Sequence, residues 1–324
     1  MTRVAILDDY QGVALSSADW KSLGPEVTFE AFHESLSGED VLAERLADFE
    51  VIVAMRERTQ LPGSLLGRLP KLKLLVTTGM RNVAIDVRAA AARGIVVSGT
   101  DLLTPPTAEL TWGLILALAR NIPREAQQMR AGGWQTTIGV GLNGKVLGVV
   151  GLGKLGSEVA RVGRAFQMEV IAWSQNLSPE HAGSLGVTRV GKDELFRRAD
   201  FVTIHLVLSK RTRGLVAGRD LALMKPSAYL INTSRGPIVE ERALLDALVN
   251  RKLAGAAVDV YDQEPLPADH PLRGLDNVVL TPHLGYVTVE NYRECYGQAV
   301  EDIGAFLAGS PVRVISGAEP AARA

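Results

Sequence analysis

The chain has 324 residues, of which 47% are apolar and 22% are charged, and its formal net charge is −1. This composition is close to the average for globular proteins, so it indicates neither a disordered chain nor a membrane protein. The near-neutral charge provides no basic field for nucleic acid, and no apolar run approaches the ~20 residues that span a bilayer. We therefore expect no nucleic-acid partner, no membrane partner and, at this length, about two domains.

The single cysteine and the start of the chain both bear on the compartment. Cys295 has no second cysteine with which to form an internal disulfide, and residues 1–3 run into an apolar segment without resembling a signal peptide. Both features favour the cytoplasm. Cys295 lies in a helical pattern without an activating partner nearby in sequence, so we expect a buried packing residue rather than a nucleophile.

The first hundred residues alternate between strand and helix patterns. Short apolar runs predict strands at 4–7, 27–29, 51–55, 72–77 and 95–98. A helical pattern occupies residues 39–47, and such alternation favours a parallel sheet covered by helices. A long helix is predicted at 108–119, followed by a loop at 132–143.

The segment 146–156 (VLGVVGLGKLG) predicts an apolar strand, a glycine turn and the first turn of a helix. Gly151 allows a tight turn, Gly153 allows backbone N–H groups to approach a pyrophosphate, and Gly156 allows the helix to pack against its strand. The positive end of the helix then faces the phosphates. The predicted phosphate-binding residues are Gly151, Gly153, Lys154, Leu155 and Gly156.

Six apolar strands are predicted from this point on. They lie at 146–150, 169–173, 201–206, 229–232, 256–260 and 278–280. Parallel strands after a glycine turn of this kind suit a doubly wound nucleotide-binding fold with the strand order 3-2-1-4-5-6. A long helix at 289–307 is expected to return to the first domain.

Three charged residues follow predicted strands. Arg235 lies in NTSRG, Glu264 in DVYDQEP and His283 in TPHLG. Taken singly, each is more simply interpreted as a surface arginine, a turn residue or a structural histidine. Together, at the ends of successive strands beside a dinucleotide site, they predict an active site.

With these residues identified, the chain resembles the D-isomer-specific 2-hydroxyacid dehydrogenases, the family that includes phosphoglycerate dehydrogenase, hydroxypyruvate reductase and glyoxylate reductase. The resemblance covers nearly the whole chain and rests on the glycine turn and on segments 107–110 (TAEL), 231–236 (INTSRG), 259–265 (DVYDQEP) and 281–285 (TPHLG). It implies an α/β fold of two domains and a homodimer. A Rossmann-type NAD-binding domain at 103–287 would be inserted into a flavodoxin-like substrate-binding domain formed by 1–102 and 288–324.

The residue types explain the expected chemistry. Reducing a 2-oxo acid requires a hydride at the carbonyl carbon and a proton at its oxygen. The guanidinium of Arg235 can hold the substrate carboxylate and polarise the carbonyl. His283 can donate the proton and accept it in the reverse direction, and Glu264 can orient the imidazole and favour its charged form.

The resemblance also implies supporting roles on both domains. Asp259 would contact the nicotinamide carboxamide, with Thr233 and Ser234 nearby. Backbone N–H groups of Gly79 and Met80 would help to hold the substrate carboxylate. Arg56 and Arg81 are candidates for the distal group of the substrate, although a plain surface role fits either arginine equally well. No metal site is expected.

One position departs from the usual pattern for NAD. An acidic residue normally bonds the adenosine ribose about 20 residues past the glycines, but this chain has Ser174, followed by Gln175 and Asn176. The usual repulsion of a 2′-phosphate is therefore missing, while no arginine stands there to attract one. We expect NAD as cofactor, with NADP as the alternative.

Two other functions on the same scaffold compete with a reductase of 2-oxo acids. One is an NAD(H)-sensing corepressor, which can retain the same three residues. The other is a formate dehydrogenase-like enzyme, against which Glu264 argues, because that group has glutamine in its place. The preferred substrates are hydroxypyruvate and glyoxylate, with phosphoglycerate as a further possibility.

Overall fold

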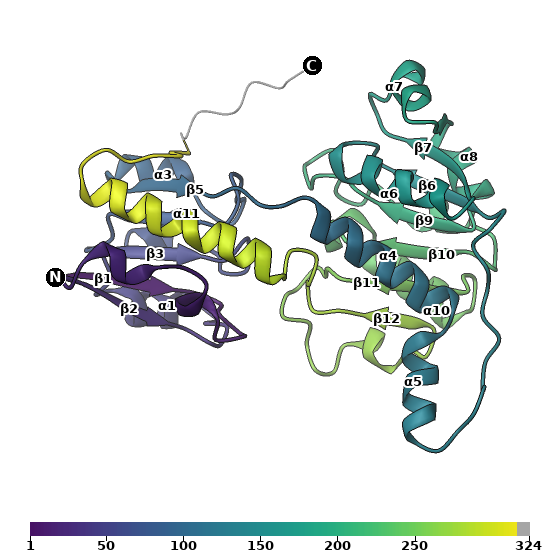
Figure 1. The fold of residues 1–324 in the computed structure, drawn as a ribbon, viewed down its shortest axis with the longest axis horizontal. Helices are drawn as coiled ribbons and strands as arrows, with labels where there is room; N and C mark the ends of the chain where they lie inside the picture. The colour runs from purple at the N-terminus through teal and green to yellow at the C-terminus, as the bar shows by residue number, and fades with distance from the viewer. Residues whose placement is uncertain (316–324) are drawn as a thin grey trace. The chain divides into compact units, whose positions relative to one another are not determined.

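The computed structural model describes residues 1–315 and divides the chain into two compact units. The first unit comprises Met1–Leu103 and the chain from Val287 onward, and the second unit is Thr104–Tyr286 (Figure 1). Each unit is a parallel sheet covered by helices, which confirms the predicted α/β class.

The sheet of the first unit contains all five predicted strands in the order β2-β1-β3-β4-β5. The strands are β1 (Thr2–Ile6), β2 (Val27–Ala31), β3 (Val51–Ala54), β4 (Leu74–Thr77) and β5 (Val96–Gly99). Every neighbouring pair is parallel. This is the order of flavodoxin-like sheets, in which functional groups gather at the carboxyl ends of the strands.

Helices cover both faces of this sheet. One face packs against α1 (Glu39–Leu46), α2 (Gly63–Leu66) and α3 (Val87–Ala92). The other carries α11 (Val289–Leu307), which crosses β4 and β5 (Figure 1). This helix buries Cys295, as expected for a packing residue, and burial raises the pKa of its thiol to about 12. Two short 3₁₀ helices, Ala14–Ser16 and Trp20–Leu23, follow β1.

The chain after α11 pairs with the edge of the same sheet. The N–H of Ile315 donates to the carbonyl of Val97 at 2.7 Å, and Val314 forms an antiparallel bridge with Ser98. Nearby, Nε of Arg313 donates to the buried carboxylate of Asp302 on α11 at 2.9 Å. The free edge of β5 is thereby covered.

The second unit has a seven-stranded parallel sheet in the order β12-β11-β10-β9-β6-β7-β8. The strands are β6 (Val146–Val150), β7 (Glu169–Trp173), β8 (Thr188–Arg189), β9 (Phe201–Ile204), β10 (Tyr229–Asn232), β11 (Gly255–Val258) and β12 (Val278–Leu280). The sequence predicted six of these strands and missed β8, which is two residues long and exposed. A strand this short has no apolar pattern to detect. The predicted order 3-2-1-4-5-6 was therefore wrong for the six named strands, which run 2-1-3-4-5-6, because β8 takes the third place in the sheet.

The helices of the second unit lie on the two faces of its sheet. The core on one face involves α4 (Pro105–Ala119) and α6 (Lys154–Ala165). The core on the other involves α8 (Lys192–Arg198), α9 (Gly218–Leu221) and α10 (Glu241–Val249). The remaining elements are α5 (Ile122–Arg130), α7 (Pro179–Ser184) and the 3₁₀ helices Gly236–Ile238 and Pro271–Gly274.

Helix α5 was not predicted from the sequence. It buries none of its residues and extends away from the rest of the second unit (Figure 1). Ile122, Ala126 and Met129 do recur at helical spacing, but they form a short apolar stripe that the fold leaves exposed.

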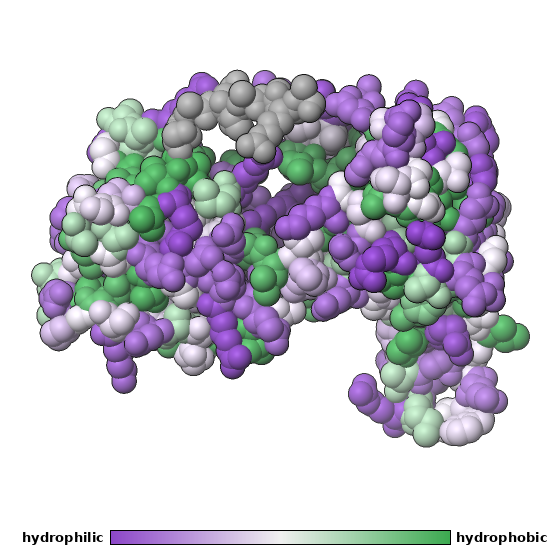
Figure 2. All heavy atoms as spheres, turned by 45° about the horizontal axis from the view of Figure 1, so that its top comes forward, coloured by the Kyte–Doolittle hydropathy of each residue, from purple (hydrophilic) through white to green (hydrophobic). Residues whose placement is uncertain are grey.

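Within residues 1–315, no helix combines the length and the apolarity needed to cross a membrane. In the same residues, the side chains of His, Cys, Asp and Glu form no cluster suited to a metal ion. Figure 2 shows hydrophilic and hydrophobic residues interspersed over the visible face.

Asp302 provides a test of the packing around α11. Burial raises the pKa of Asp302 to about 6, and the neighbouring Arg313 opposes the rise only in part. Between about pH 4 and pH 6 the folded protein retains a proton that the unfolded chain has lost, so the stability falls as the pH rises. The Asp302→Asn variant lacks this titration. Its free energy of unfolding relative to the native protein should rise by up to about 2–3 kcal/mol between pH 4 and pH 7, measured by urea unfolding.

The neighbouring Glu301→Gln substitution is the matched control, because Glu301 also pairs with Arg313 but is exposed. It should show no comparable gain. A difference between Asp302→Asn and the native protein that stays constant over this pH range would contradict the prediction.

Candidate active site

The glycine turn after β6 has the close approaches that the sequence predicts. Gly151 has φ +101°, and a Cβ at this residue would lie 2.5 Å from the carbonyl oxygen of His205. A Cβ at Gly156 would lie 2.0 Å from the carbonyl oxygen of Gly151. Both positions therefore require glycine.

The space in front of the turn is suited to a pyrophosphate. A Cβ at Gly153 would meet nothing within 4 Å, and α6 begins at Lys154 with no side chain capping its first turn. The first N–H groups of a helix that lack such a cap can bind an anion. The residues present therefore fit a dinucleotide.

Ser174 directly follows β7, beside the glycine turn. The N–H of Gly151 donates to the carbonyl of Trp173 at 2.8 Å, which ties the turn to the end of this strand. Neither Ser174 nor the next two residues, Gln175 and Asn176, carries a carboxylate.

The segment after β10 is held by its own polar side chains. The side-chain amide of Asn232 donates to the carbonyl of Arg235 at 3.0 Å and accepts from the N–H of Ser234 at 3.1 Å. The hydroxyl of Ser234 donates to the carbonyl of Ile204 at 2.7 Å. Thr233 shares a hydrogen bond of 2.9 Å with Thr111 of α4. These contacts fix the backbone that carries Arg235.

Asp259, which follows β11, is fully buried and holds the segment after β12. Its carboxylate accepts hydrogen bonds from the hydroxyl of Thr281 at 2.6 Å and from the N–H groups of Leu284 at 2.7 Å and Gly285 at 3.0 Å. Burial raises the pKa of Asp259, and these hydrogen bonds and the charge of His283 oppose the rise. The carboxylate thus clamps the turn around His283, while its contact with a nicotinamide stays a prediction.

Within that turn, His283 has a left-handed backbone with φ +56°. This conformation is uncommon for residues other than glycine and often marks functional sites. The hydrogen bonds to Asp259 on both sides of His283 hold the turn, and the imidazole packs edge-on against Tyr286 with ring centroids 5.4 Å apart. The ring is mostly buried.

Glu264 and His283 form a short pair. Oε2 of Glu264 lies 2.6 Å from Nδ1 of His283, and Oε1 accepts from the N–H of Tyr261 at 2.9 Å. Burial favours a raised pKa for Glu264, but the hydrogen bond and charge of His283, with smaller contributions from Tyr261 and Arg235, hold this pKa below its ordinary value. Because Nδ1 faces the carboxylate, Nε2 is the ring nitrogen suited to exchange a proton with a substrate.

The structure brings the arginine segment against the glutamate segment. A Cβ at Gly236 would lie 2.1 Å from the carbonyl carbon of Tyr261, so the two backbones pack in direct contact there. The charge of Arg235 correspondingly lowers the pKa of Glu264. Arg235, Glu264 and His283, predicted separately from the sequence, thus gather at the carboxyl edge of one sheet.

In the first unit, the structure brings together two of the predicted substrate-binding residues. Nη1 of Arg56 donates to the carbonyl of Thr78 at 2.9 Å. The same nitrogen lies so close to Gly79 that a Cβ there would be 1.9 Å away. Met80 and Arg81 follow in an exposed turn, and Arg81 makes no hydrogen bond or ion pair within the described residues.

Sequence reasoning missed a polar cluster at the same edge of the first sheet. Asp8 is buried after β1 and accepts from the hydroxyls of Thr59 at 2.7 Å and Tyr10 at 2.9 Å. The guanidinium of Arg58 stacks over the ring of Tyr10 at 4.7 Å. The sequence analysis also did not single out Thr281 as a site residue. Its position was informative, because Thr281 is a polar residue at a strand end, two positions before His283.

Comparison with known proteins extends the resemblance. A statistical model of the D-isomer specific 2-hydroxyacid dehydrogenase NAD binding domain matches residues 112–285. The chain is 39% identical over 272 residues to D-3-phosphoglycerate dehydrogenase of Methanocaldococcus jannaschii, covering 83% of this chain and 52% of that protein. It is 39% identical over 255 residues to glyoxylate reductase of Aeropyrum pernix, covering 76% of each.

A solved structure shows the same fold. Phosphoglycerate oxidoreductase from Vibrio cholerae O395 superposes with a TM-score of 0.91 at 39% identity, covering 96% of this chain and 100% of that chain. The chain spans about half the length of the phosphoglycerate dehydrogenase from Methanocaldococcus jannaschii. The extent of the matched domain and these identities lead to one conclusion: the chain belongs to the D-isomer specific 2-hydroxyacid dehydrogenase family.

Proposed function

We propose that the protein is a nicotinamide-dependent oxidoreductase that interconverts a small D-2-hydroxy acid and its 2-oxo acid. The observation that carries this proposal is the pairing of Glu264 with His283 at 2.6 Å, beside Arg235 and on the same sheet as the glycine turn. The names of the relatives, phosphoglycerate dehydrogenase and glyoxylate reductase, support this class of substrate. We propose hydroxypyruvate or glyoxylate as the preferred 2-oxo acid.

Each catalytic residue has one task in this proposal. The bound nicotinamide supplies or accepts the hydride. Arg235 binds the substrate carboxylate and polarises the carbonyl, so that its carbon faces the cofactor. His283 delivers a proton from Nε2 to the carbonyl oxygen, and Glu264 stabilises the charged imidazole through Nδ1.

The two units have different roles in the proposal. We propose the second unit as the dinucleotide-binding domain, with Gly151, Gly153, Lys154, Leu155 and Gly156 at the pyrophosphate. Ser174 would lie at the adenosine ribose, and Thr233, Ser234 and Asp259 near the nicotinamide. The first unit would be the substrate-binding domain, contributing N–H groups of Gly79 and Met80 and the guanidinium groups of Arg56 and Arg81.

We also propose that the protein acts in the cytoplasm as a homodimer and has no nucleic-acid partner. The lone, buried cysteine supports the cytoplasm as the compartment, and the formal charge of −1 supports the absence of a nucleic-acid partner. Support for a dimer comes from α5 and the loop after it, where Met129, Trp134 and Ile138 are 60%, 73% and 95% exposed. Large apolar side chains gathered on a protruding segment are typical of association surfaces.

The activity is tested with a panel of 2-oxo acids and NADH or NADPH, followed at the nicotinamide absorbance. We expect turnover of hydroxypyruvate or glyoxylate, and His283→Asn should reduce it by about 10²–10⁴-fold because the proton donor is lost. Asparagine is the appropriate replacement, because it tolerates the left-handed backbone at this position. Full turnover by His283→Asn would contradict the assigned role.

Glu264→Gln serves as the companion variant in that experiment. It keeps a hydrogen-bonding group but removes the negative charge that stabilises the imidazolium of His283. As the pH is raised, the rate of reduction by this variant should therefore begin to decline at a lower pH than that of the native enzyme. If the native protein binds the cofactor but turns over none of the 2-oxo acids in the panel, that result would instead favour an NAD(H)-sensing corepressor.

Ser174→Asp tests the cofactor site. A carboxylate at this position would repel the 2′-phosphate of NADP and bond the ribose hydroxyls of NAD. The ratio of kcat/KM for NADH over NADPH should rise on the order of tenfold or more, since an unfavourable pair of like charges costs several kcal/mol. An unchanged ratio would show that this residue does not face the ribose.

The homodimer is tested with Ile138→Asp, which places a charge in the exposed apolar segment. Light scattering should give the mass of a dimer for the native protein and a shift toward the monomer for the variant. Val41→Asp is the control, since Val41 is a partly exposed apolar residue of α1 in the first unit. A monomeric native protein would overturn the proposal.

A further inference from the structure

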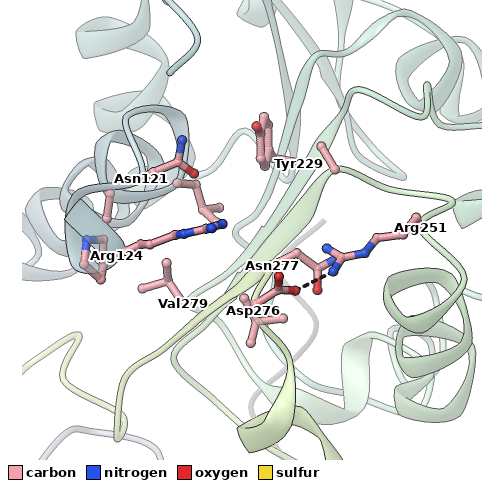
Figure 3. Close-up of a pocket in the computed structure, with 12 residues that line it drawn as sticks. Asn121, Arg124, Tyr229, Arg251, Asp276, Asn277 and Val279 are labelled. Atoms are coloured by element: carbon pink, nitrogen blue, oxygen red, sulfur yellow. Dashed lines mark hydrogen bonds and ion pairs between the residues drawn. The ribbon is translucent and has the colours of Figure 1, made fainter. Parts of the chain in front are cut away.

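A pocket of about 200 Å³ lies in the second unit (Figure 3), and none of the proposed catalytic residues lines it. It is lined by the starts of three strands, at Tyr229 of β10, Ala254 before β11 and Val278 of β12. Arg235, Asp259 and His283 follow the opposite, carboxyl ends of these strands. The pocket is therefore separate from the site of the proposed reaction.

Two arginines reach this pocket from opposite sides (Figure 3). Arg251 is bound to the carboxylate of Asp276. Arg124, on the first turn of α5, makes no hydrogen bond or ion pair with any residue in the range 1–315. The hydrogen bond and charge of Arg251, with a smaller contribution from the charge of Arg124, lower the pKa of Asp276. The lining thus contains two guanidinium groups and one carboxylate, which gives the pocket a net positive charge.

The remaining lining combines neutral polar groups, from Tyr229, Asn121 and Asn277, with apolar side chains. The ring of Tyr229 stacks on Phe201 with centroids 5.1 Å apart, and its hydroxyl makes no hydrogen bond within the described part of the chain. Burial raises the pKa of Tyr229, so the hydroxyl remains protonated at neutral pH. Ala117, Leu118, Val278 and Val279 provide apolar surface next to these polar groups.

We propose that this pocket binds a small organic anion, a carboxylate on a short apolar body, through the guanidinium of Arg124 and the hydroxyl of Tyr229. A guanidinium matches a carboxylate in a bidentate, charge-assisted arrangement. The volume corresponds to roughly six or seven water molecules at about 30 Å³ each, which suits an acid of a few carbon atoms. In this proposal Ala117, Leu118, Val278 and Val279 contact the carbon atoms of the acid.

The proposal is tested by direct titration, independently of turnover. The native protein is titrated with isobutyrate, with its neutral analogue isobutyramide and with inorganic phosphate, and binding is followed by protein NMR. We expect saturable binding of isobutyrate and none of isobutyramide. Arg124→Gln should weaken isobutyrate binding at least about tenfold, because a charge-assisted hydrogen bond is lost.

Arg130→Gln is the matched control, because Arg130 lies in the last turn of the same helix and does not line the pocket. It should bind isobutyrate as the native protein does. Equal binding by Arg124→Gln and the native protein, or saturation by phosphate alone, would overturn the proposal. A change in particle mass caused by Arg124→Gln in light scattering would overturn it as well, by assigning the pocket to an interface with a second copy of the chain.

Discussion

The proposed site depends on one buried carboxylate. Asp259 has no exposed surface, and each of its oxygens is occupied by groups from the segment after β12. Burying a carboxylate without hydrogen-bond partners costs free energy. Asp259 can therefore be fully buried only because these groups donate hydrogen bonds to it. Through this clamp, the left-handed backbone of His283 is held in place. The position of the proposed proton donor is thus determined by a residue that need not touch the substrate.

The parallel sheet explains why the other groups meet there. All strands of the second unit run in one direction, so their carboxyl ends share an edge. Arg235 and Glu264 approach each other because Gly236 allows the two backbones to touch. The opposite edge of the same sheet carries the basic pocket around Arg124. The sheet therefore carries the proposed catalytic groups where its strands end and the basic pocket where three of its strands begin.

The sequence predicted the features that leave a local pattern. All five strands of the first sheet, six of the seven strands of the second, the glycine turn and the family were predicted correctly, because apolar periodicity and glycine spacing are local. Helix α5 and strand β8 were missed, since neither buries an apolar face.

Contacts between distant residues also escaped prediction. The clamp of Asp259 on residues 281–285 joins groups more than 20 positions apart, and the cluster of Asp8 with Thr59 spans 51 positions. Such pairs depend on how strands are placed side by side, which the spacing of residues within one strand does not specify. The pocket at the starts of β10, β11 and β12 is hidden from sequence for the same reason.

The division of the chain has a consequence for the order in which it folds during synthesis. The second unit is one continuous segment, whereas the first unit combines Met1–Leu103 with the chain from Val287 onward. The first sheet emerges early, but the face covered by α11 stays open until residues 289–307 have been made. Exposed apolar strands are prone to aggregation during this interval. The second unit, although it emerges later, can acquire all its internal contacts before the first unit does.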